Sequence, residues 1–319
     1  MSARIMAAQR SDSTQDDFAA RRARISAQAA QAAALARRMP LITMEARRVS
    51  AAVSAGLHGR GRAGPGENFW QYRPLIPGES AARIDWRRSA RHDGQLFLRE
   101  HEWDAARTIH LFIDRSESMD YASGQGPQKS ESALIIGLAL ADLLVRAGER
   151  VRLMGITEPS ASRAIIDRLA EALIVTPSDD AALPRSTPLS RDDRVVLIGD
   201  FITTIENVEQ CLSTLSATGA RGAMLRIMDP AEVSFPFTGD LELVGMETTL
   251  SRKIGNGAAF RNAALDALDA HQRALEASAQ RYGFSFHTYL TDQTASAVLF
   301  SLMHALAQRD GGAMARTHG

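Results

Sequence analysis

The segment DRSESM, residues 114–119, places three oxygen-bearing side chains at alternate positions directly after an apolar run. Alternate residues of an extended loop point to the same side, so Asp114, Ser116 and Ser118 can converge on one point. A carboxylate and two hydroxyls are hard oxygen donors, which suit Mg²⁺ or another divalent cation. A second carboxylate, Asp200, follows the apolar run RVVLIG in the same way.

Each acid also has a simpler interpretation, because a carboxylate that ends a strand often caps the next helix or forms a turn. For one such residue this interpretation would be preferred. Two acids at two strand ends, one of them followed by Ser-x-Ser, favour a cluster of cation ligands instead. We therefore expect a cation site, with the turn as the alternative.

The rest of the sequence must bring Asp114 and Asp200 together, and over residues 108–309 short apolar runs alternate with amphipathic stretches. The expected strands are 108–113, 150–156, 194–199, 223–228 and 284–290. The expected helices lie near 131–147, 163–173, 204–218, 259–281 and 293–308. This alternation predicts an α/β fold with a doubly wound, mostly parallel sheet. In such sheets the ligand crevice lies beyond the carboxyl ends of the strands, where both acids fall.

The pattern divides the chain into four segments: 1–55, 56–107, 108–310 and 311–319. The first is rich in Ala, Arg and Gln, which favours helix, but it has few large apolar side chains. We expect a peripheral helix that ends at Pro40 and buries little surface, then a second short helix from Ile42 to Ala55. Residues 56–107 look irregular apart from one strand in QLFLREHEW. Residues 311–319 should form a flexible tail.

Composition narrows the class of protein. The 319 residues are 45% hydrophobic and carry a formal net charge of zero, so no global field favours nucleic acid or an anionic membrane. The single cysteine, Cys211, excludes a disulfide framework within the chain and should pack as a small hydrophobe. The N-terminus lacks the apolar core of a secretory signal, and the most hydrophobic stretch, 133–148, is too short to span a bilayer. We expect a cytoplasmic protein with no direct membrane insertion.

The DRSESM loop, followed by Lys129 and a hydrophobic helix, resembles the metal-ion-dependent adhesion site of von Willebrand factor type A domains. In those domains an Asp-x-Ser-x-Ser loop leaves the first strand, and both serines ligate the metal. The resemblance implies that Ser116 and Ser118 are direct ligands and that Asp114 contacts the ion directly or through water. It implies that Asp200 holds an ordered water.

The preceding segment, GENFWQYRPLIPGESAARIDWRRSAR, resembles the signature of bacterial domain-of-unknown-function family fifty-eight. That pattern is roughly Glu-x-Phe, an Arg-x-Tyr-x-Pro-Gly-Asp element, then Ile-Asp-Trp-x-x-Ser-Ala-Arg. The resemblance spans about Gly59 to Asp200, with departures at Leu75, Glu79 and Ala82. The matching residues are Glu67, Phe69, Arg73, Pro77, Gly78, Ile84, Asp85, Trp86, Ser89, Ala90 and Arg91.

The charged residues of this signature suggest a scaffold. Asp85 lies among arginines that include Arg83 and Arg91, and bidentate arginine–carboxylate pairs can fix an irregular segment against a sheet. Trp86 would supply apolar packing, and Arg73 belongs to the same signature. A direct partner-binding surface is the alternative.

Members of this family typically lack an established biochemical activity. They are similar to type A proteins whose genes neighbour MoxR-type AAA+ ATPases, and are thought to act with them in assembly, maturation or metal insertion of protein complexes. The resemblance implies a non-enzymatic interaction module with a Mg²⁺-type site, which an acidic side chain of a MoxR-type ATPase or its client completes. It also implies a threonine ligand, for which Thr176 and Thr187 are the candidates.

Two other functions stay open. A haloacid-dehalogenase-like phosphatase with Asp114 as nucleophile would need an acid two residues later, and Ser116 cannot take that role near neutral pH. Arginines around Trp86 could bind nucleic acid, but the interleaved Asp85 and Asp93 and the zero net charge oppose this. The GxGxxG in GRGRAGPG follows no strand, no GxxxxGK[ST] is present, and the histidines lack metal-binding spacing.

Overall fold

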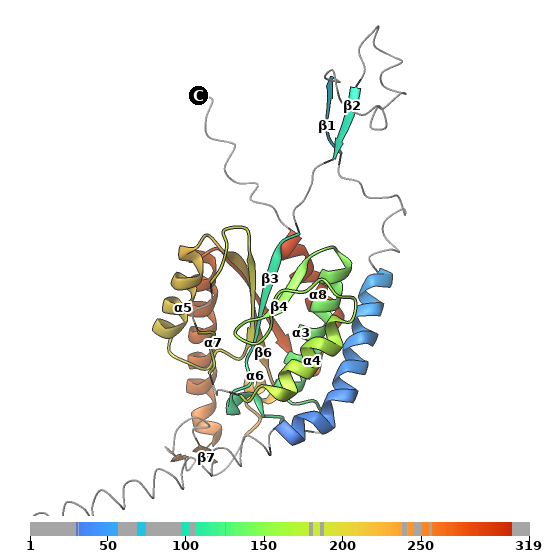
Figure 1. The fold of residues 1–319 in the computed structure, drawn as a ribbon. Coiled ribbons are helices and arrows are strands. Elements are labelled where there is room, and N and C mark those ends of the chain that lie inside the picture. The colour runs from blue at the N-terminus through green and yellow to red at the C-terminus, as the bar shows by residue number, and fades with distance from the viewer. Residues whose placement is uncertain are drawn as a thin grey trace, which may run out of the picture. The chain divides into compact units, whose positions relative to one another are not determined.

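The structure is a computed structural model of the chain (Figure 1). It forms two compact units, Ala55–Ala106 on the one hand and Met1–Ser54 with Arg107–Gly319 on the other. The residues that it describes are 30, 32–56, 69–74, 97–101, 106–124, 126–178, 181–185, 188–237, 241–244, 251–254 and 257–307.

The larger unit is built on a five-stranded sheet in which all strands run parallel, in the order β4-β3-β5-β6-β9. The strands are β3 (Thr108–Ile113), β4 (Arg150–Leu153), β5 (Arg194–Gly199), β6 (Arg221–Met228) and β9 (Phe284–Leu290). All six residues of β5 are buried, as expected for a central strand with both faces covered. The predicted α/β fold with a doubly wound parallel sheet is confirmed.

Two layers of helices cover the sheet (Figure 1). The longer helices are α3 (Lys129–Arg146), α4 (Ile165–Val175), α5 (Ile205–Ala217), α7 (Gly257–Arg281) and α8 (Ala295–Ala307), and the short ones are η2 (Glu117–Met119) and α6 (Pro230–Ser234). One apolar core lies under α3, α4 and α8 and takes in Val196 and Ile198 of β5. The opposite core lies under α5 and α7 and takes in Val195 and Leu197. Within the described residues, no helix is both long and apolar enough to cross a membrane.

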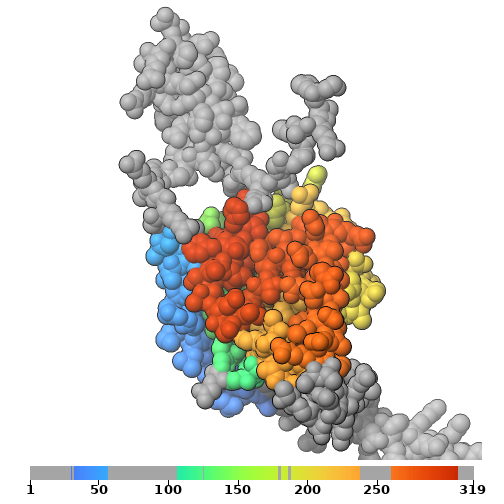
Figure 2. Space-filling view, turned by 180° about the vertical axis from the view of Figure 1, so that it is seen from behind, coloured from blue at the N-terminus to red at the C-terminus, as the bar shows by residue number. Residues whose placement is uncertain are grey.

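The helix at residues 32–56 differs from the sequence-based expectation in two ways. It continues through Pro40, where a break was predicted, and it buries a stripe of apolar side chains in the core under α3. A proline inside a helix costs about 3 kcal/mol, but each fully buried large apolar side chain contributes about 1.5–3 kcal/mol, so the packing outweighs the proline. Figure 2 shows this helix, in blue, beside the red C-terminal residues. The buried stripe consists of Met39, Ile42, Ala46, Val49 and Val53.

Polar contacts also anchor this helix to α3. The Ser50 hydroxyl donates to the buried Asp142 carboxylate over 2.8 Å. At the other end, the guanidinium of Arg38 donates to Glu131 over 2.6 Å and to Gln128 over 2.7 Å. These two acceptors form the capping box at the start of α3, so the N-terminal helix supports the segment that carries Lys129.

Two antiparallel hairpins complete the described elements. In the smaller unit, β1 (Phe69–Pro74) pairs with β2 (Phe97–His101), which confirms the strand predicted in QLFLREHEW but adds a partner that was expected to be irregular. In the larger unit, β7 (Leu241–Val244) pairs with β8 (Ser251–Ile254), and neither strand was predicted.

Candidate cation-binding site

Asp114 and Asp200 follow adjacent strands at the carboxyl edge of the sheet. Ile113 of β3 pairs with Ile198 of β5, and the Asp114 N–H donates to the Ile198 carbonyl over 2.8 Å. The chain leaves β3 through α3 to β4 on one side, then returns through α4 to β5 on the other. The edge between β3 and β5 is therefore the topological switch point, where open α/β sheets form their ligand crevice.

Gly199 allows these two strand ends to approach each other closely. A Cβ atom at this position would lie 2.8 Å from the Cβ and 3.0 Å from Oδ2 of Asp114. Protein interiors are too closely packed to absorb such an overlap without a shift of the neighbouring group. A larger residue at position 199 would displace the Asp114 side chain.

The loop after β3 is folded by its own hydrogen bonds. Oδ1 of Asp114 accepts a hydrogen bond from the Ser116 N–H over 2.8 Å, and the Ser116 carbonyl accepts one from the Met119 N–H over 3.0 Å. These bonds bring the hydroxyl oxygens of Ser116 and Ser118 to 3.1 Å from each other. Asp114 and Ser116 are fully buried, and Ser118 is nearly so. The predicted convergence of the two hydroxyls is present.

Lys129, the first residue of α3, lies at the centre of a buried ion-pair cluster. Its Nζ donates to Oδ2 of Asp200 over 2.9 Å and to Oε1 of Glu232 over 2.8 Å. The ammonium also lies 5.9 Å from the centre of the Tyr121 ring. Burial by itself would lower the pKa of Lys129, but attraction to the two carboxylates outweighs it, so the pKa is raised. The side chain is 1% exposed and charged at neutral pH.

The turn after β5 fixes the Asp200 carboxylate from the other side. Oδ1 of Asp200 accepts from the Ile202 N–H over 3.0 Å, and its carbonyl accepts from Nε of the buried Arg226 over 3.3 Å. Phe201 has a positive φ of 53°, which is strained for a bulky residue. The Phe201 carbonyl is 2.9 Å from Nε2 of His271 on α7. Contacts from β6 and α7 therefore hold the turn in a conformation that it would not adopt by itself.

Asp229, at the end of β6, connects the loop after η2 to α6. Its carboxylate accepts from the Ser123 N–H over 3.0 Å and from the Ala231 N–H over 2.8 Å, and its own N–H donates to Glu232 over 2.8 Å. Burial raises the pKa of Asp229, but these hydrogen bonds outweigh it, so the pKa lies below its usual value. The capping box of α6 thus fixes the Glu232 side chain that meets Lys129.

Comparison with known proteins identifies the family. The sequence profile described as "Protein of unknown function DUF58" matches residues 71–274. The chain belongs to the DUF58 family. It is 26% identical over 279 residues to uncharacterized proteins of Mycobacterium bovis and of two strains of Mycobacterium tuberculosis, which covers 79% of this chain and 82% of each relative. A solved structure, the conserved hypothetical protein BatB from Bacteroides thetaiotaomicron, is 12% identical with a TM-score of 0.32, covering 64% of this chain and 100% of that chain.

The spacing of two hydroxyl oxygens in this DUF58 chain is compatible with a divalent cation. Two ligands at about 2.0–2.1 Å from an octahedral Mg²⁺ and at right angles to each other are about 2.9 Å apart. The 3.1 Å between the hydroxyls of Ser116 and Ser118 is close to this value, and Asp114 supplies a negative charge beside them. The described residues contain no group of three or more His, Cys, Asp or Glu side chains suited to a metal. Any cation here would therefore depend on serine ligands.

Asp200 is placed differently from these three residues. Its Oδ2 already accepts a hydrogen bond from Lys129, and its Oδ1 already accepts one from the Ile202 N–H. The charge of Asp200 is balanced inside the protein. The fit to a cation therefore depends on residues 114–118, which we call the serine loop. A role of Asp200 in holding a ligated water stays a prediction.

These contacts do not identify either threonine candidate as a cation ligand. Thr176 ends α4, and its backbone carbonyl accepts a hydrogen bond from Nη1 of Arg115 over 3.0 Å. Thr187 lies outside the described residues. The identity of a threonine ligand stays a prediction.

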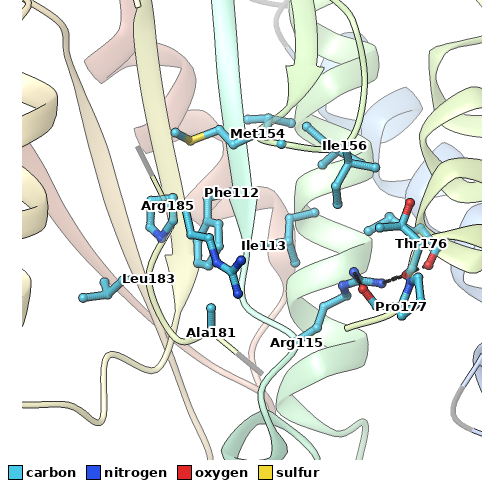
Figure 3. A pocket seen from close by; sticks show the side chains of 15 residues that line it. Phe112, Ile113, Arg115, Met154, Ile156, Thr176, Pro177, Ala181, Leu183 and Arg185 are labelled. Atoms are coloured by element: carbon cyan, nitrogen blue, oxygen red, sulfur yellow. Dashed lines mark hydrogen bonds between the residues drawn. The ribbon is translucent and has the colours of Figure 1, made fainter. Parts of the chain in front are cut away.

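A cavity of about 250 Å³ adjoins the serine loop on the α4 side (Figure 3). Arg115, which sits between Asp114 and Ser116, donates to the carbonyls of Leu173, Thr176 and Pro177 at the end of α4. Figure 3 shows this guanidinium turned toward Thr176, with Phe112 and Leu183 on the opposite wall. The loop conformation is thus coupled to the end of α4.

The remaining predicted residues fall into two groups. Arg73 lies on β1 opposite Leu98 of β2. The other signature residues, Arg83, Asp85, Trp86 and Arg91, lie outside the described residues, and their scaffolding role stays a prediction.

Cys211 and His110 serve packing in this structure. Cys211 packs against the core under α5, where burial raises the pKa of its thiol to about 11. His110, on β3, is buried and has Nε2 2.9 Å from the carboxylate of Asp193. The expectation of a packed cysteine is confirmed.

Sequence reasoning named Lys129 only as part of a loop and missed Glu232 and Arg226. One signal was available for Lys129. The chain contains 37 Lys and Arg residues, and only two of them, Lys129 and Lys253, are lysines. In so arginine-rich a chain, a lysine at the start of the helix that follows the DRSESM loop indicates a place for a compact ammonium rather than a planar guanidinium.

Proposed function

We propose that this DUF58 protein is a non-enzymatic interaction module with a divalent-cation site of the adhesion type. Ser116 and Ser118 ligate the ion, Asp114 contacts it directly or through water, and a carboxylate of a protein partner completes the coordination. The bound ion supplies a positive charge that bridges the two proteins. Mg²⁺ is the first candidate, since its preferred ligands are hard oxygens and it keeps several waters.

The observation that carries this proposal is the buried pair of hydroxyls at the switch point of the sheet. Neutral hydroxyls bind a cation without adding charge, so the ion keeps a net positive charge that can attract a partner's carboxylate. The loop is preorganised by the bonds from Asp114 and Ser116, so little conformational entropy is lost on binding.

Apolar side chains next to the site favour a protein as the partner. Ile202, two residues after Asp200, is 51% exposed, and Val233, next to Glu232, is 42% exposed. Exposed aliphatic groups around a polar centre are typical of protein interfaces, in which an apolar area excludes water from the central polar contact.

The partner we expect is a MoxR-type AAA+ ATPase or its client, which follows from the family's resemblance to type A proteins that act with such ATPases. The protein would work with it in the cytoplasm, in assembly or maturation of protein complexes. Neither nucleic-acid binding nor membrane insertion is part of this function.

The decisive experiment captures partners from lysate with tagged wild-type protein and with Asp114→Ala, each in Mg²⁺ and in a chelator. We expect partners that bind the wild type in Mg²⁺ and are lost under the other three conditions. The matched control is Asp120→Ala, which removes an exposed carboxylate from the same loop and should keep the Mg²⁺-dependent partners. The same partners under all four conditions would contradict a metal-bridged interface.

An assay of phosphomonoester turnover tests the enzymatic alternative on the same proteins. We expect no turnover above the level of Asp114→Asn. Turnover by the wild type that disappears in Asp114→Asn would replace the interaction module with a phosphatase.

A further inference from the structure

Lys129 occupies a position that is unfavourable for a cation unless something specific compensates it. It is 1% exposed, and it is the first residue of α3, where the positive end of the helix dipole opposes an ammonium. Two carboxylates from different elements compensate it, Asp200 after β5 and Glu232 on α6. One of the two carboxylates that the sequence assigns to the cation site is therefore already bound to an internal cation.

The balance of charges at this edge is low for a divalent ion. Four carboxylates and three cations have contacts that define this edge, which leaves a net charge of −1: Asp114, Asp200, Asp229 and Glu232 against Arg115, Lys129 and Arg226. Affinity for hard divalent cations rises with the number of charged ligands. With these cations in place, the net charge of −1 is smaller than the charge of +2 that a divalent ion carries.

We propose that Lys129 is an internal counter-cation that keeps the serine loop from holding a divalent ion tightly until a partner contributes its own carboxylate. This inference rests on the proposed function and specifies its regulation. The cation and the partner bind together, because the partner's carboxylate supplies the charge that Lys129 cancels. By thermodynamic linkage, the partner raises the affinity for the cation by the same factor as the cation raises the affinity for the partner.

A purely structural role is the competing explanation, because Lys129 also ties α3, the β5 turn and α6 together. A structural ion pair would affect folding but would not change the affinity for a cation in a variant that folds. Measurement of cation affinity therefore separates the two roles.

The test is Mn²⁺ binding to the isolated full-length chain, followed through the electron paramagnetic resonance signal of free Mn²⁺. Lys129→Met keeps the length of the side chain and removes its charge. We expect Lys129→Met to bind Mn²⁺ about tenfold or more tightly than the wild type. The reason is that the substitution removes the positive charge of the ammonium, which repels the cation. The matched control is Lys253→Met, which removes the other lysine and should leave the affinity unchanged.

A double variant distinguishes charge from packing. Lys129→Met combined with Glu232→Gln restores the net charge of −1, so its Mn²⁺ affinity should fall back toward that of the wild type. The proposal is overturned if folded Lys129→Met binds Mn²⁺ no more tightly than the wild type, or if the double variant keeps the full gain.

If Lys129→Met does not fold, a measurement on the wild type tests the proposal instead. With ¹³C-labelled lysine the protein has two lysine signals, and Lys253→Arg assigns them. We expect Mn²⁺ alone to broaden the Lys129 signal only at millimolar concentrations, and saturable broadening at micromolar Mn²⁺ would overturn the proposal. Tight Mn²⁺ binding that Asp114→Ala abolishes would leave the proposed function intact, whereas partner capture that ignores the metal would remove the proposed function itself.

Discussion

The candidate site has two halves that handle buried polar groups in opposite ways. The hydroxyl half consists of Asp114, Ser116 and Ser118, and the ion-pair half consists of Lys129, Asp200 and Glu232. In the hydroxyl half, the bond that Oδ1 of Asp114 accepts and the bond between the two hydroxyls join residues two positions apart. In the ion-pair half, the partners of Lys129 lie 71 and 103 residues away.

This difference indicates which half of the site binds a cation and which half stabilises the fold. The hydroxyl half has one charged group, Asp114, and two neutral hydroxyls. These hydroxyls can give up the hydrogen bond between them and bind a cation instead at little cost in free energy. The ion-pair half has charges that are already satisfied, and loss of one partner leaves the others buried without compensation. We therefore expect substitutions in the hydroxyl half to weaken cation binding with little change in stability. Substitutions in the ion-pair half should lower stability, even where cation affinity rises, as in Lys129→Met.

Lys129→Met should produce the largest effect on stability. The buried Asp200 and the partly buried Glu232 lose their partner, and breaking a buried ion pair from one side costs about 3–5 kcal/mol. Urea unfolding in a chelator measures this loss. Arg48→Met is the control, because its pair with Glu45 is exposed and should contribute little. Equal effects of the two substitutions would show that burial is not what separates the ion-pair half from a surface pair.

Gly199→Ala should have the next largest effect, because it acts on the contact between the two halves. The added Cβ overlaps with Asp114, and overpacking of this kind costs about 1–3 kcal/mol. Asp114 would move, so Mn²⁺ binding should weaken as well. Gly124→Ala is the control, since nothing lies within 4 Å of a Cβ there. Wild-type stability and Mn²⁺ affinity in Gly199→Ala would contradict the close approach of the two strand ends.

Ser118→Ala should separate binding from stability. Only one hydrogen bond between hydroxyls is lost, worth about 1 kcal/mol, yet a cation ligand disappears. We expect a small shift in the urea midpoint and a large loss of Mn²⁺ affinity, or of metal-dependent partner capture. Ser130→Ala, whose hydroxyl donates to the exposed Asp120, should change neither cation affinity nor capture. Unchanged Mn²⁺ affinity and capture in Ser118→Ala would remove Ser118 from the cation site.

Asp229→Asn should have the smallest effect, which is present at neutral pH and fades in acid. The pKa of Asp229 is lower in the folded protein than its ordinary value of 3.8, so its contribution to stability is present above that value. The contribution is lost as the pH falls through the folded pKa. The stability of Asp229→Asn should therefore decrease less than that of the wild type below about pH 4. Identical pH profiles would show that the hydrogen bonds at α6 do not stabilise the carboxylate form.

Much of the fold could be predicted because its signals are local. The strands at Thr108–Ile113, Arg194–Gly199 and Phe284–Leu290 have the predicted bounds, since each is a short apolar run between polar segments. The prediction for the second strand was too long, and β4 ends at Leu153. Hairpins β7–β8 and β1–β2 escaped notice or were seen only in part, because short strands without a continuous apolar run carry a weak signal.

The error at Pro40 has a different cause. Proline disfavours a helix interior through local sterics and a lost hydrogen bond, and this part of the prediction was physically sound. The helix persists because its buried stripe and the contacts of Arg38 and Ser50 hold it against α3. The segment is rich in Ala and has few large apolar residues. Its sequence therefore gave little indication that these apolar residues lie on one face of the helix, where they can be buried.

The sequence by itself determined the parallel α/β sheet and the positions of Asp114 and Asp200 at the ends of two of its strands. It also determined the serine loop, because the bonds that fold this loop join residues close in the chain. Only the tertiary structure decided that Lys129 neutralises Asp200 and reaches Glu232. The pairing of a buried ammonium depends on which distant carboxylates the fold packs around it and on the exclusion of water from all of them, and no local pattern contains that information.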